Sequence, residues 1–358
     1  MAKKGGRRSS GSAAKVRAGV IGAGAIGPAH MGGYREAAAA ELTAVCDVHR
    51  GRAQAAAAEF GIPHVFTDYR KMLAADVVDA VSVCTPNNTH LPITVAALQA
   101  GKHVLCEKPL AFDGRQGRRM VAAARKARRV LMTAQSMRYG GGAMLLKKMA
   151  EEGRFGDLYF GKGMMLRRTG IPRGWFQDVA QSGGGPLIDI GVHLLDFLWW
   201  VMGMPKPVSA FGVTFDHLGK TGQGMGGWGV NYAPAGFSVE DLASGLVRFR
   251  GGKAISIEAS WAAHTGDSYF ARILGTKGGA QLSPELVLYE MTGDTKLEVR
   301  PQPAKVDGYV EEVRHFLRCI QRREKPISDA SQSVVVMDML AAIYRSARTG
   351  RAVSLAGR

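Results

Sequence analysis

Short apolar runs alternate with segments of helical periodicity along the chain from Val16 to Met132. The apolar runs have the length of buried strands and lie at Val16–Ile21, Leu42–Cys46, Ala80–Cys84, His103–Cys106 and Val130–Met132. The helical segments lie between them, at Ile26–Ala40, Gly51–Phe60, Thr89–Ala100 and Gly114–Arg128. Strands and helices that alternate at this spacing form βαβ units. The pattern therefore predicts an α/β domain over residues 15–138, with a parallel, doubly wound sheet.

The pattern changes after Tyr139. Helices are predicted at Ala143–Glu152 and Pro186–Met202. Five later segments alternate apolar and polar residues between glycine-rich turns, namely Val208–Val213, Asp241–Phe249, Ala254–Trp261, Tyr269–Leu274 and Leu286–Glu290. This alternation is typical of antiparallel strands with one buried face. We therefore expect an α+β domain over residues 139–330, with a large, mainly antiparallel open sheet.

Three further segments complete the organisation of the chain. Gly219–Gly236 is rich in glycine and lacks periodicity, so it is either a plain connection or a cover for an active site. Helices are predicted at Tyr309–Arg322 and Ser331–Arg348, and the second is followed by Gly350, as expected at a helix end. We expect residues 331–358 to pack back on the first domain.

The chain of 358 residues is long for one hydrophobic core, which agrees with two domains. Its formal net charge is +17, and the first 17 residues contain six positive residues and no acidic one. A disordered basic tail over residues 1–14 and an arginine-rich surface explain most of this charge. Anionic ligands such as dinucleotides or acidic sugars stay possible. No nucleic-acid-binding motif accompanies the charge, so we expect no nucleic-acid partner.

The sequence also limits location and metal content. No apolar stretch approaches the ~20 residues that span a bilayer, so we expect no membrane association. Arg7-Arg8 suggests twin-arginine export, but Ser9-Ser10-Gly11-Ser12 follows instead of an apolar segment, and we reject export. The four cysteines are too scattered for a disulfide framework, which favours the reducing cytoplasm. We expect no metal, because His, Cys and carboxylates do not cluster at ligand spacing.

A glycine-rich turn follows the first predicted strand and opens the first helix. Gly22, Gly24 and Gly27 form a Gly-x-Gly-x-x-Gly pattern, with Ala25 and Ile26 between the last two glycines. In a Rossmann domain these glycines allow a tight turn, close approach to a pyrophosphate, and packing of helix on strand.

Asp47 at the end of the next strand strengthens this prediction of a dinucleotide site, because its carboxylate can accept hydrogen bonds from the adenosine ribose. A carboxylate also repels a 2′-phosphate, which favours NAD over NADP. His49 and Arg50 follow closely, and an arginine there could neutralise that phosphate, so NADP stays open.

Three longer motifs are more specific than the glycines: Thr85-Pro86-Asn87-Asn88-Thr89-His90, Cys106-Glu107-Lys108-Pro109 and Gly183-Gly184-Gly185-Pro186-Leu187-Ile188-Asp189-Ile190-Gly191-Val192-His193. With these motifs in this order, the chain resembles the Gfo/Idh/MocA family, the relatives of glucose-fructose oxidoreductase and inositol dehydrogenase. The resemblance implies an NAD-dependent oxidoreductase that transfers a hydride between nicotinamide and a hydroxyl of a sugar, sugar derivative or cyclitol. It also implies a homodimer or homotetramer.

The resemblance further implies which residues form the site. Lys108, Asp189 and His193 would be catalytic, and Glu107 and Lys108 would lie near the nicotinamide and its ribose. Thr85, Pro86, Asn87 and His90 would line the dinucleotide.

The residue types support these roles on physical grounds. Lys108 lies at the carboxyl end of a parallel strand, where α/β proteins bind ligands, and partial burial should lower its pKa. Pro186 is a natural first residue of a helix, so Asp189 falls in the first turn and His193 one turn later on the same face. We expect Asp189 to orient His193, which would act as a general base. Alternatively, His193 is a core histidine and Asp189 a helix cap, because the helix is strongly apolar.

Further candidate substrate contacts are Arg138, Tyr139, Arg167, Arg168, Trp175 and Phe176. Arginines and aromatic rings together suggest a polar ring substrate, either neutral or acidic. Two other activities remain open. The first is a redox-neutral enzyme that cleaves a glycoside through transient oxidation while NAD stays bound. The second is a non-catalytic, dinucleotide-dependent sensor.

Overall fold

The first domain is built on a sheet of six parallel strands in the order β3-β2-β1-β4-β5-β6. A computed structural model of the chain describes residues 14–226 and 236–355. The strands are β1 (Val16–Ile21), β2 (Ala40–Cys46), β3 (His64–Phe66), β4 (Ala80–Val83), β5 (His103–Glu107) and β6 (Leu131–Ala134). The intervening helices are α1 (Gly27–Glu36), α2 (Arg50–Phe60), α3 (Tyr69–Ala74), α4 (Asn87–Gln99) and α5 (Gly114–Ala127). The predicted doubly wound parallel sheet is therefore confirmed.

Two details of this domain differ from the sequence-based expectation. The helix expected at Ile26–Ala40 ends at Glu36, because Ala40 already begins β2 and pairs with Val16 of β1. The pattern also missed β3 and α3, which are only three and six residues long. Such short elements carry too few residues for periodicity to show.

The second domain contains a mixed sheet of nine strands in the order β14-β13-β12-β11-β7-β10-β9-β8-β15. Its strands are β7 (Leu158–Leu166), β8 (Pro207–Phe215), β9 (Leu242–Phe249), β10 (Ala254–Ser260), β11 (Ser268–Gly275), β12 (Gly278–Gln281), β13 (Val287–Thr292), β14 (Thr295–Val299) and β15 (Val353–Ser354). All its described pairs are antiparallel except β7 with β10, which confirms the expected mainly antiparallel sheet.

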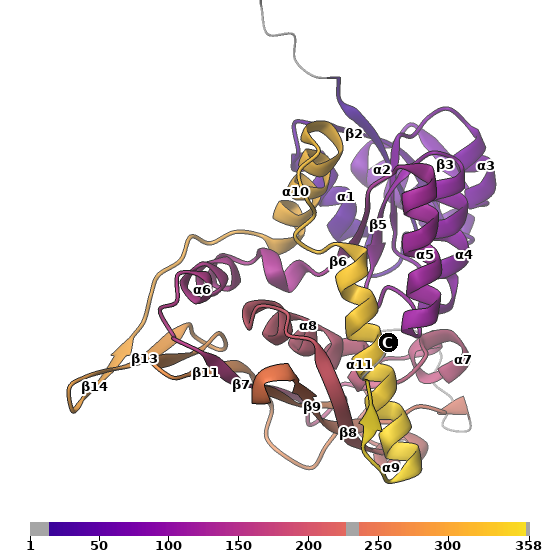
Figure 1. Cartoon of the computed structure of the whole chain (residues 1–358). Helices are drawn as coiled ribbons and strands as arrows, with labels where there is room; N and C mark the ends of the chain where they lie inside the picture. The colour runs from indigo at the N-terminus through magenta and orange to yellow at the C-terminus, as the bar shows by residue number, and fades with distance from the viewer. Residues whose placement is uncertain (1–13, 227–235, 356–358) are drawn as a thin grey trace, which may run out of the picture.

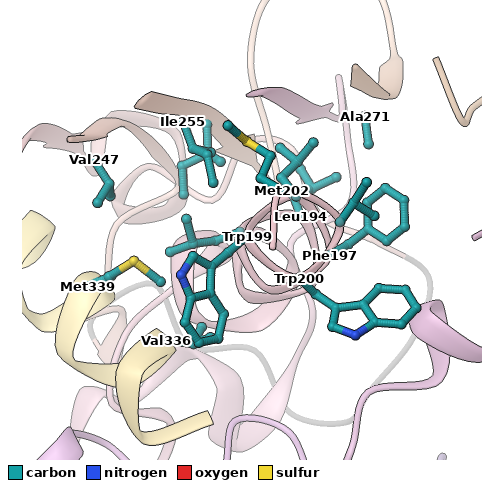
Figure 2. Packing of buried hydrophobic residues seen from close by; sticks show 14 of the residues in the cluster. Leu194, Phe197, Trp199, Trp200, Met202, Val247, Ile255, Ala271, Val336 and Met339 are labelled. Atoms are coloured by element: carbon teal, nitrogen blue, oxygen red, sulfur yellow. The ribbon is translucent and has the colours of Figure 1, made fainter. Parts of the chain in front are cut away.

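Helices cover one face of this second sheet (Figure 1). The short helical elements are α6 (Gly141–Glu151), α7 (Val179–Ser182), α8 (Val192–Val201), α9 (His217–Lys220), the 3-10 turns Ser136–Tyr139, Gly174–Gln177 and Arg250–Gly252, and a π-helical turn at Leu187–Gly191. α8 is buried along its whole length except at His193, and it lies in the core. Figure 2 shows Phe197, Trp199 and Trp200 of α8 packed among residues of the sheet and of the C-terminal helix.

The last two helices are α10 (Gly308–Arg322) and α11 (Ala330–Thr349), and α11 contacts both domains. Asp307 caps the start of α10, and its side chain accepts hydrogen bonds from two backbone N–H groups of the helix. α10 packs against α1 of the first domain, although its residues fall within the range 139–330 that we assigned to the second domain. α11 contacts α5 of the first domain and β8 of the second, and Figure 1 shows it running from beside β6 of the first sheet to β8 of the second. Gly114 and Gly117 of α5 let α11 approach closely, because an added Cβ would meet Asp338 or Val334.

The described ranges 14–226 and 236–355 contain no helix long and apolar enough to cross a membrane. The basic tail expected over residues 1–14 lies outside the described residues up to position 13, and positions 227–235 of the expected glycine-rich loop lie outside them too.

A buried ion pair links the end of the first domain to α8. The guanidinium of Arg138 is fully buried and donates to both carboxylate oxygens of Asp196, at 2.7 and 2.6 Å. It also donates to the carbonyl of Ile327, just before α11, and to the side chain of Gln332 on α11. One side chain therefore connects three segments at the domain junction.

We expect Arg138→Met to lower the free energy of unfolding by ~3–5 kcal/mol, because the Asp196 carboxylate would stay buried without its cation. Urea unfolding followed by circular dichroism would measure this loss. The double variant Arg138→Met/Asp196→Leu should regain most of it, since no unpaired charge is left. A loss of less than ~1 kcal/mol in the single variant would contradict the assigned role.

Candidate functional site

A cavity of about 250 Å³ lies between the two domains at the carboxyl ends of β4 and β5. It is lined by Ala25, Ile26, Thr85, Asn87, Glu107, Lys108, Pro109, Ala134, Ser136, Trp175, Phe176, Asp189, His193 and Tyr309. Larger clefts of about 880 and 830 Å³ exist, but Lys108, Asp189 and His193 line neither of them. The smaller cavity is the one that joins the glycine turn to Lys108, Asp189 and His193.

The glycine turn has the form required for a bound pyrophosphate. Gly22 has a φ of 102°, and a Cβ there would meet the Cys84 carbonyl at 2.2 Å. A Cβ on Gly27 would meet the Gly22 carbonyl at 2.4 Å, so this glycine is needed for helix packing. Nothing lies within 4 Å of a Cβ built on Gly24, which therefore faces open space in front of α1. The open backbone at the start of a helix fits a dinucleotide.

Asp47 lies at the end of β2, and its carboxylate is fixed by several donors. It accepts from the backbone N–H of Ala23 at 2.9 Å and of His49 at 2.8 Å, and from the Arg52 guanidinium at 2.9 Å. Burial alone would raise the pKa of Asp47, but the hydrogen bonds from Arg52 and the backbone outweigh it and lower the pKa. The sequence drew attention to His49 and Arg50, whereas the arginine that reaches Asp47 is Arg52, the third residue of α2.

The segment Thr85–His90 follows β4, and its side chains contact residues of both domains. Pro86 is the N-cap of α4, and the Asn87 side chain donates to the Ser182 carbonyl at 2.7 Å. The buried His90 ring lies between two carbonyl oxygens, at 2.9 Å from that of Thr85 and 2.8 Å from that of Pro109. His90 thereby ties the loop after β4 to the loop after β5.

Lys108 and Asp189 form an ion pair across the domains. The Lys108 ammonium donates to the Asp189 carboxylate at 3.0 Å and to its carbonyl at 2.8 Å. Burial lowers the pKa of Lys108, but the charges of Asp189 and Glu107 outweigh it, so the pKa is raised. The expectation of a lowered lysine pKa is therefore wrong, because a carboxylate compensates the buried ammonium.

Asp189 and His193 lie on consecutive helical segments, the π-helical turn and α8. The turn is held by Glu240, which accepts from the backbone N–H of Gly185 at 2.9 Å and of Leu187 at 3.1 Å. Tyr344 of α11 donates to the same carboxylate at 2.8 Å. The catalytic segment is thus anchored by a residue just before β9 and by the C-terminal helix.

The expected hydrogen bond from Asp189 to His193 is not present. The second carboxylate oxygen of Asp189 accepts from the buried indole N–H of Trp261 at 3.0 Å. Nδ1 of His193 is buried and has no hydrogen-bond partner among the described residues. Burial and then the Lys108 charge lower the pKa of His193 to about 3, so its imidazole is neutral. Asp189 therefore orients Lys108 rather than His193.

The further substrate candidates separate into two groups. Trp175 and Phe176 line the cavity as a stacked pair with ring centroids 3.8 Å apart. Arg138 and Tyr139 do not reach it, since both are buried, Arg138 in its ion pair and Tyr139 hydrogen-bonded to Ser328 at 2.9 Å. Their expected substrate contacts are corrected to structural ones.

Arg167 and Arg168 directly follow the end of β7, and neither of them lines the cavity. Arg167 lines another cleft, and Arg168 is exposed with its backbone N–H bonded to Asp267. Conversely, no sequence pattern indicated Tyr309, Ser136 or Trp261, whose approach to the site depends on tertiary packing. No group of three metal-binding side chains occurs in residues 14–226 and 236–355.

Comparison with known proteins gives matches over both domains. Residues 16–135 match a family model described as an oxidoreductase family with an NAD-binding Rossmann fold, and residues 143–281 match a GFO/IDH/MocA C-terminal domain. The D-glucoside 3-dehydrogenase of Escherichia coli K12 is 34% identical over 97% of this chain and 100% of its own. A D-apiose dehydrogenase of Paraburkholderia graminis is 26% identical over 95% and 90%. The crystal structure of an oxidoreductase domain protein from Kribbella flavida superposes with a TM-score of 0.86 and 26% identity, covering 96% and 100%.

The neutral state of His193 leads to a prediction about its titration. Because a lowered pKa keeps the imidazole neutral as the pH falls, the Cε1–H resonance of His193 should not shift between about pH 7.5 and about pH 5. The resonance can be assigned with His193→Asn. In Lys108→Met the pKa should rise, since the neighbouring positive charge is lost. A titration midpoint near the usual histidine value in the unaltered protein would contradict this account.

Proposed function

The chain belongs to the Gfo/Idh/MocA oxidoreductase family, and we propose that it oxidises a secondary hydroxyl of a sugar or cyclitol with NAD. The observation that carries the proposal is the meeting of Lys108, Asp189 and His193 in one cavity. Their arrangement supplies a fixed ammonium and a neutral base beside the glycine turn. The cavity also has an aromatic wall, formed by Trp175.

The residues present fit the cofactor that the first domain binds. The turn at Gly22–Gly27 would hold the pyrophosphate, and Asp47 would accept from the adenosine ribose. Thr85, Asn87 and Glu107 line the cavity where the nicotinamide would lie. When bound, NAD accepts the hydride from the substrate carbon. The ionised Asp47 favours NAD, although Arg52 beside it offers a partner for the 2′-phosphate of NADP.

The chain's own residues would perform the proton chemistry. Neutral His193 would take the proton of the reacting hydroxyl as general base. Lys108 stays an ammonium because Asp189 holds it, and it would donate to the hydroxyl oxygen as negative charge develops there. Trp261 keeps Asp189 in place through its indole N–H. His193 would therefore accept the proton, and Lys108, held by Asp189, would stabilise the negative charge that develops on the oxygen.

The cavity also favours a class of substrate. Trp175 offers the flat apolar surface on which a sugar ring can stack. Lys108 is the one lysine or arginine among its described lining residues, and Asp189 already neutralises it. We therefore propose a neutral polyhydroxylated ring rather than an acidic sugar.

A substrate panel tests the proposal. Cyclitols, free sugars, sugar acids and glycosides would be incubated with NAD and, in parallel, NADP, and both NADH absorbance and product masses would be followed. We expect NADH to form with one neutral ring compound. Lys108→Ala should lower kcat/KM by a factor of ~10²–10⁴, or ~3–5 kcal/mol, because the oxyanion loses its cation.

The same panel distinguishes the other activities. Sugar released from a glycoside without NADH would show a redox-neutral enzyme, and NAD binding without turnover of any compound would favour a sensor. A loss below tenfold in Lys108→Ala with a confirmed substrate would overturn the catalytic assignment. Lys126→Ala, on the outer surface of α5, is the matched control.

We also propose that the chain forms a homo-oligomer through the face of the second sheet that the helices leave uncovered. Phe211 and Leu246 are opposite each other on β8 and β9, and both are exposed, at 46% and 38%. Leu274 lies opposite Phe160 on the same face and is also exposed. A broad apolar surface of this kind usually marks an interface.

We expect the double variant Phe211→Lys/Leu246→Lys to halve or quarter the mass measured by light scattering after size exclusion, because lysines desolvate poorly at an interface. Arg119→Lys, at an exposed position of α5, should leave the mass unchanged. A monomeric mass for the unaltered protein at micromolar concentration would contradict the proposed assembly.

A further inference from the structure

A chain of buried polar side chains runs behind Lys108, away from the cavity. Glu107 accepts from the backbone N–H of Lys108 at 2.9 Å, and its other oxygen lies 2.9 Å from Nε2 of His30. Nδ1 of His30 lies 3.0 Å from the hydroxyl of Ser82, which lies 2.9 Å from the hydroxyl of Tyr34. Each of these side chains is at most 6% exposed. These hydrogen-bonded side chains join α1, β4 and β5.

Every hydrogen in this series of hydrogen bonds finds an acceptor in only one of the two possible directions of donation. Ser82 is the hydrogen-bond partner of the Tyr34 hydroxyl among the described residues, and burial raises the pKa of Tyr34, so the phenol keeps its proton. If Tyr34 donates to Ser82, the Ser82 hydroxyl donates to Nδ1 of His30. Nε2 of His30 then carries the hydrogen and donates to Glu107. In the reverse direction the phenol hydrogen would lack an acceptor.

Glu107 lines the cavity beside Lys108, yet it is nearly buried and makes no direct contact with the Lys108 ammonium. A buried carboxylate keeps its charge only if donors replace the lost water. Burial alone would raise the pKa of Glu107, but the His30 hydrogen bond and the Lys108 charge lower it. The carboxylate is therefore ionised because of its donors.

We propose that His30 is a positioning residue that keeps Glu107 ionised at the cofactor cavity, where the negative charge favours oxidised over reduced nicotinamide. Oxidised nicotinamide carries a positive charge that the reduced ring lacks, so a fixed carboxylate stabilises the two forms unequally. The Asp189 charge does not perform this task, because Lys108 neutralises it. This inference rests on the proposed placement of the nicotinamide in the cavity.

Other titratable groups act on Glu107 from the elements around it, but none offers a competing charge of the same kind. Burial raises the pKa of Cys84, Cys106, Tyr309 and Glu312, which therefore stay protonated. Burial lowers the pKa of His193 and His90. His30 is thus the side chain that supplies a direct hydrogen bond to the carboxylate.

The test compares the affinities of the purified protein for NAD and NADH by calorimetry, without substrate. His30→Phe keeps the ring volume but removes the donor, and it should weaken NAD binding about tenfold while NADH affinity changes less than about threefold. The loss should be larger at low pH, because a carboxylate without its donor takes up a proton there, and should diminish as the pH rises. His30→Gln, which can donate from its amide, should restore most of the difference.

Two further variants separate this role from general destabilisation. His103→Phe changes a histidine at the other end of β5 and should leave the ratio of the two affinities unchanged. Tyr34→Phe removes the terminal donor and should move the ratio in the same direction by a smaller factor, which keeps the test decisive if His30→Phe does not fold. An unchanged ratio in His30→Phe, or in Tyr34→Phe if it alone folds, would overturn the inference while leaving the proposed function intact. Failure of the unaltered protein to bind NAD would overturn both.

Discussion

The ion pair between Lys108 and Asp189 is the constraint on which the site depends, because its two halves come from different domains. Lys108 stands at the end of a parallel strand, where the sheet opens towards ligands. Asp189 stands on a π-helical turn that starts the most buried helix of the second domain. The pair lets an ammonium that is only 18% exposed keep its charge in the cavity. Burial, together with that charge, keeps His193 neutral, so the pair contributes to the protonation state of both groups.

The rest of the molecule holds these two halves at a fixed separation. Glu240 and Tyr344 anchor the backbone at Gly185, just before Asp189, and Trp261 fixes the Asp189 carboxylate. The buried pair of Arg138 and Asp196 joins the end of the first domain to α8 one turn beyond His193. Such pairs add little net stability when they replace apolar packing, but they specify one relative arrangement of the elements that they join. Rigid anchoring of this kind is what a site assembled from two domains requires.

The sequence predicted those parts of the site that depend on local order. The glycine turn, Asp47 and Lys108 each follow a strand directly, and Pro186 sets the phase of the helix that carries Asp189 and His193, so their convergence could be expected. The direction of the Lys108 pKa could not, because the prediction paired Asp189 with His193. Arg138 and Tyr139 misled for a related reason: their types suit a polyol, but only the packing of α8 and α11 shows that they face inward. Tyr309 and Trp261 are far along the chain from the motifs, and no periodicity links them to the site.

The packing of α10 on α1 has a consequence for how the chain is made. Residues 308–322 cover a face of the first domain whose strands are all complete by Ala134. During synthesis the ribosome releases the N-terminal end first, so the nascent first domain exposes the apolar side of α1 until most of the chain has emerged. α11 then closes against α5 as the last large element. Completion of the nucleotide-binding half therefore waits for the end of translation, and a chain that stops early leaves that half unfinished as well as the other.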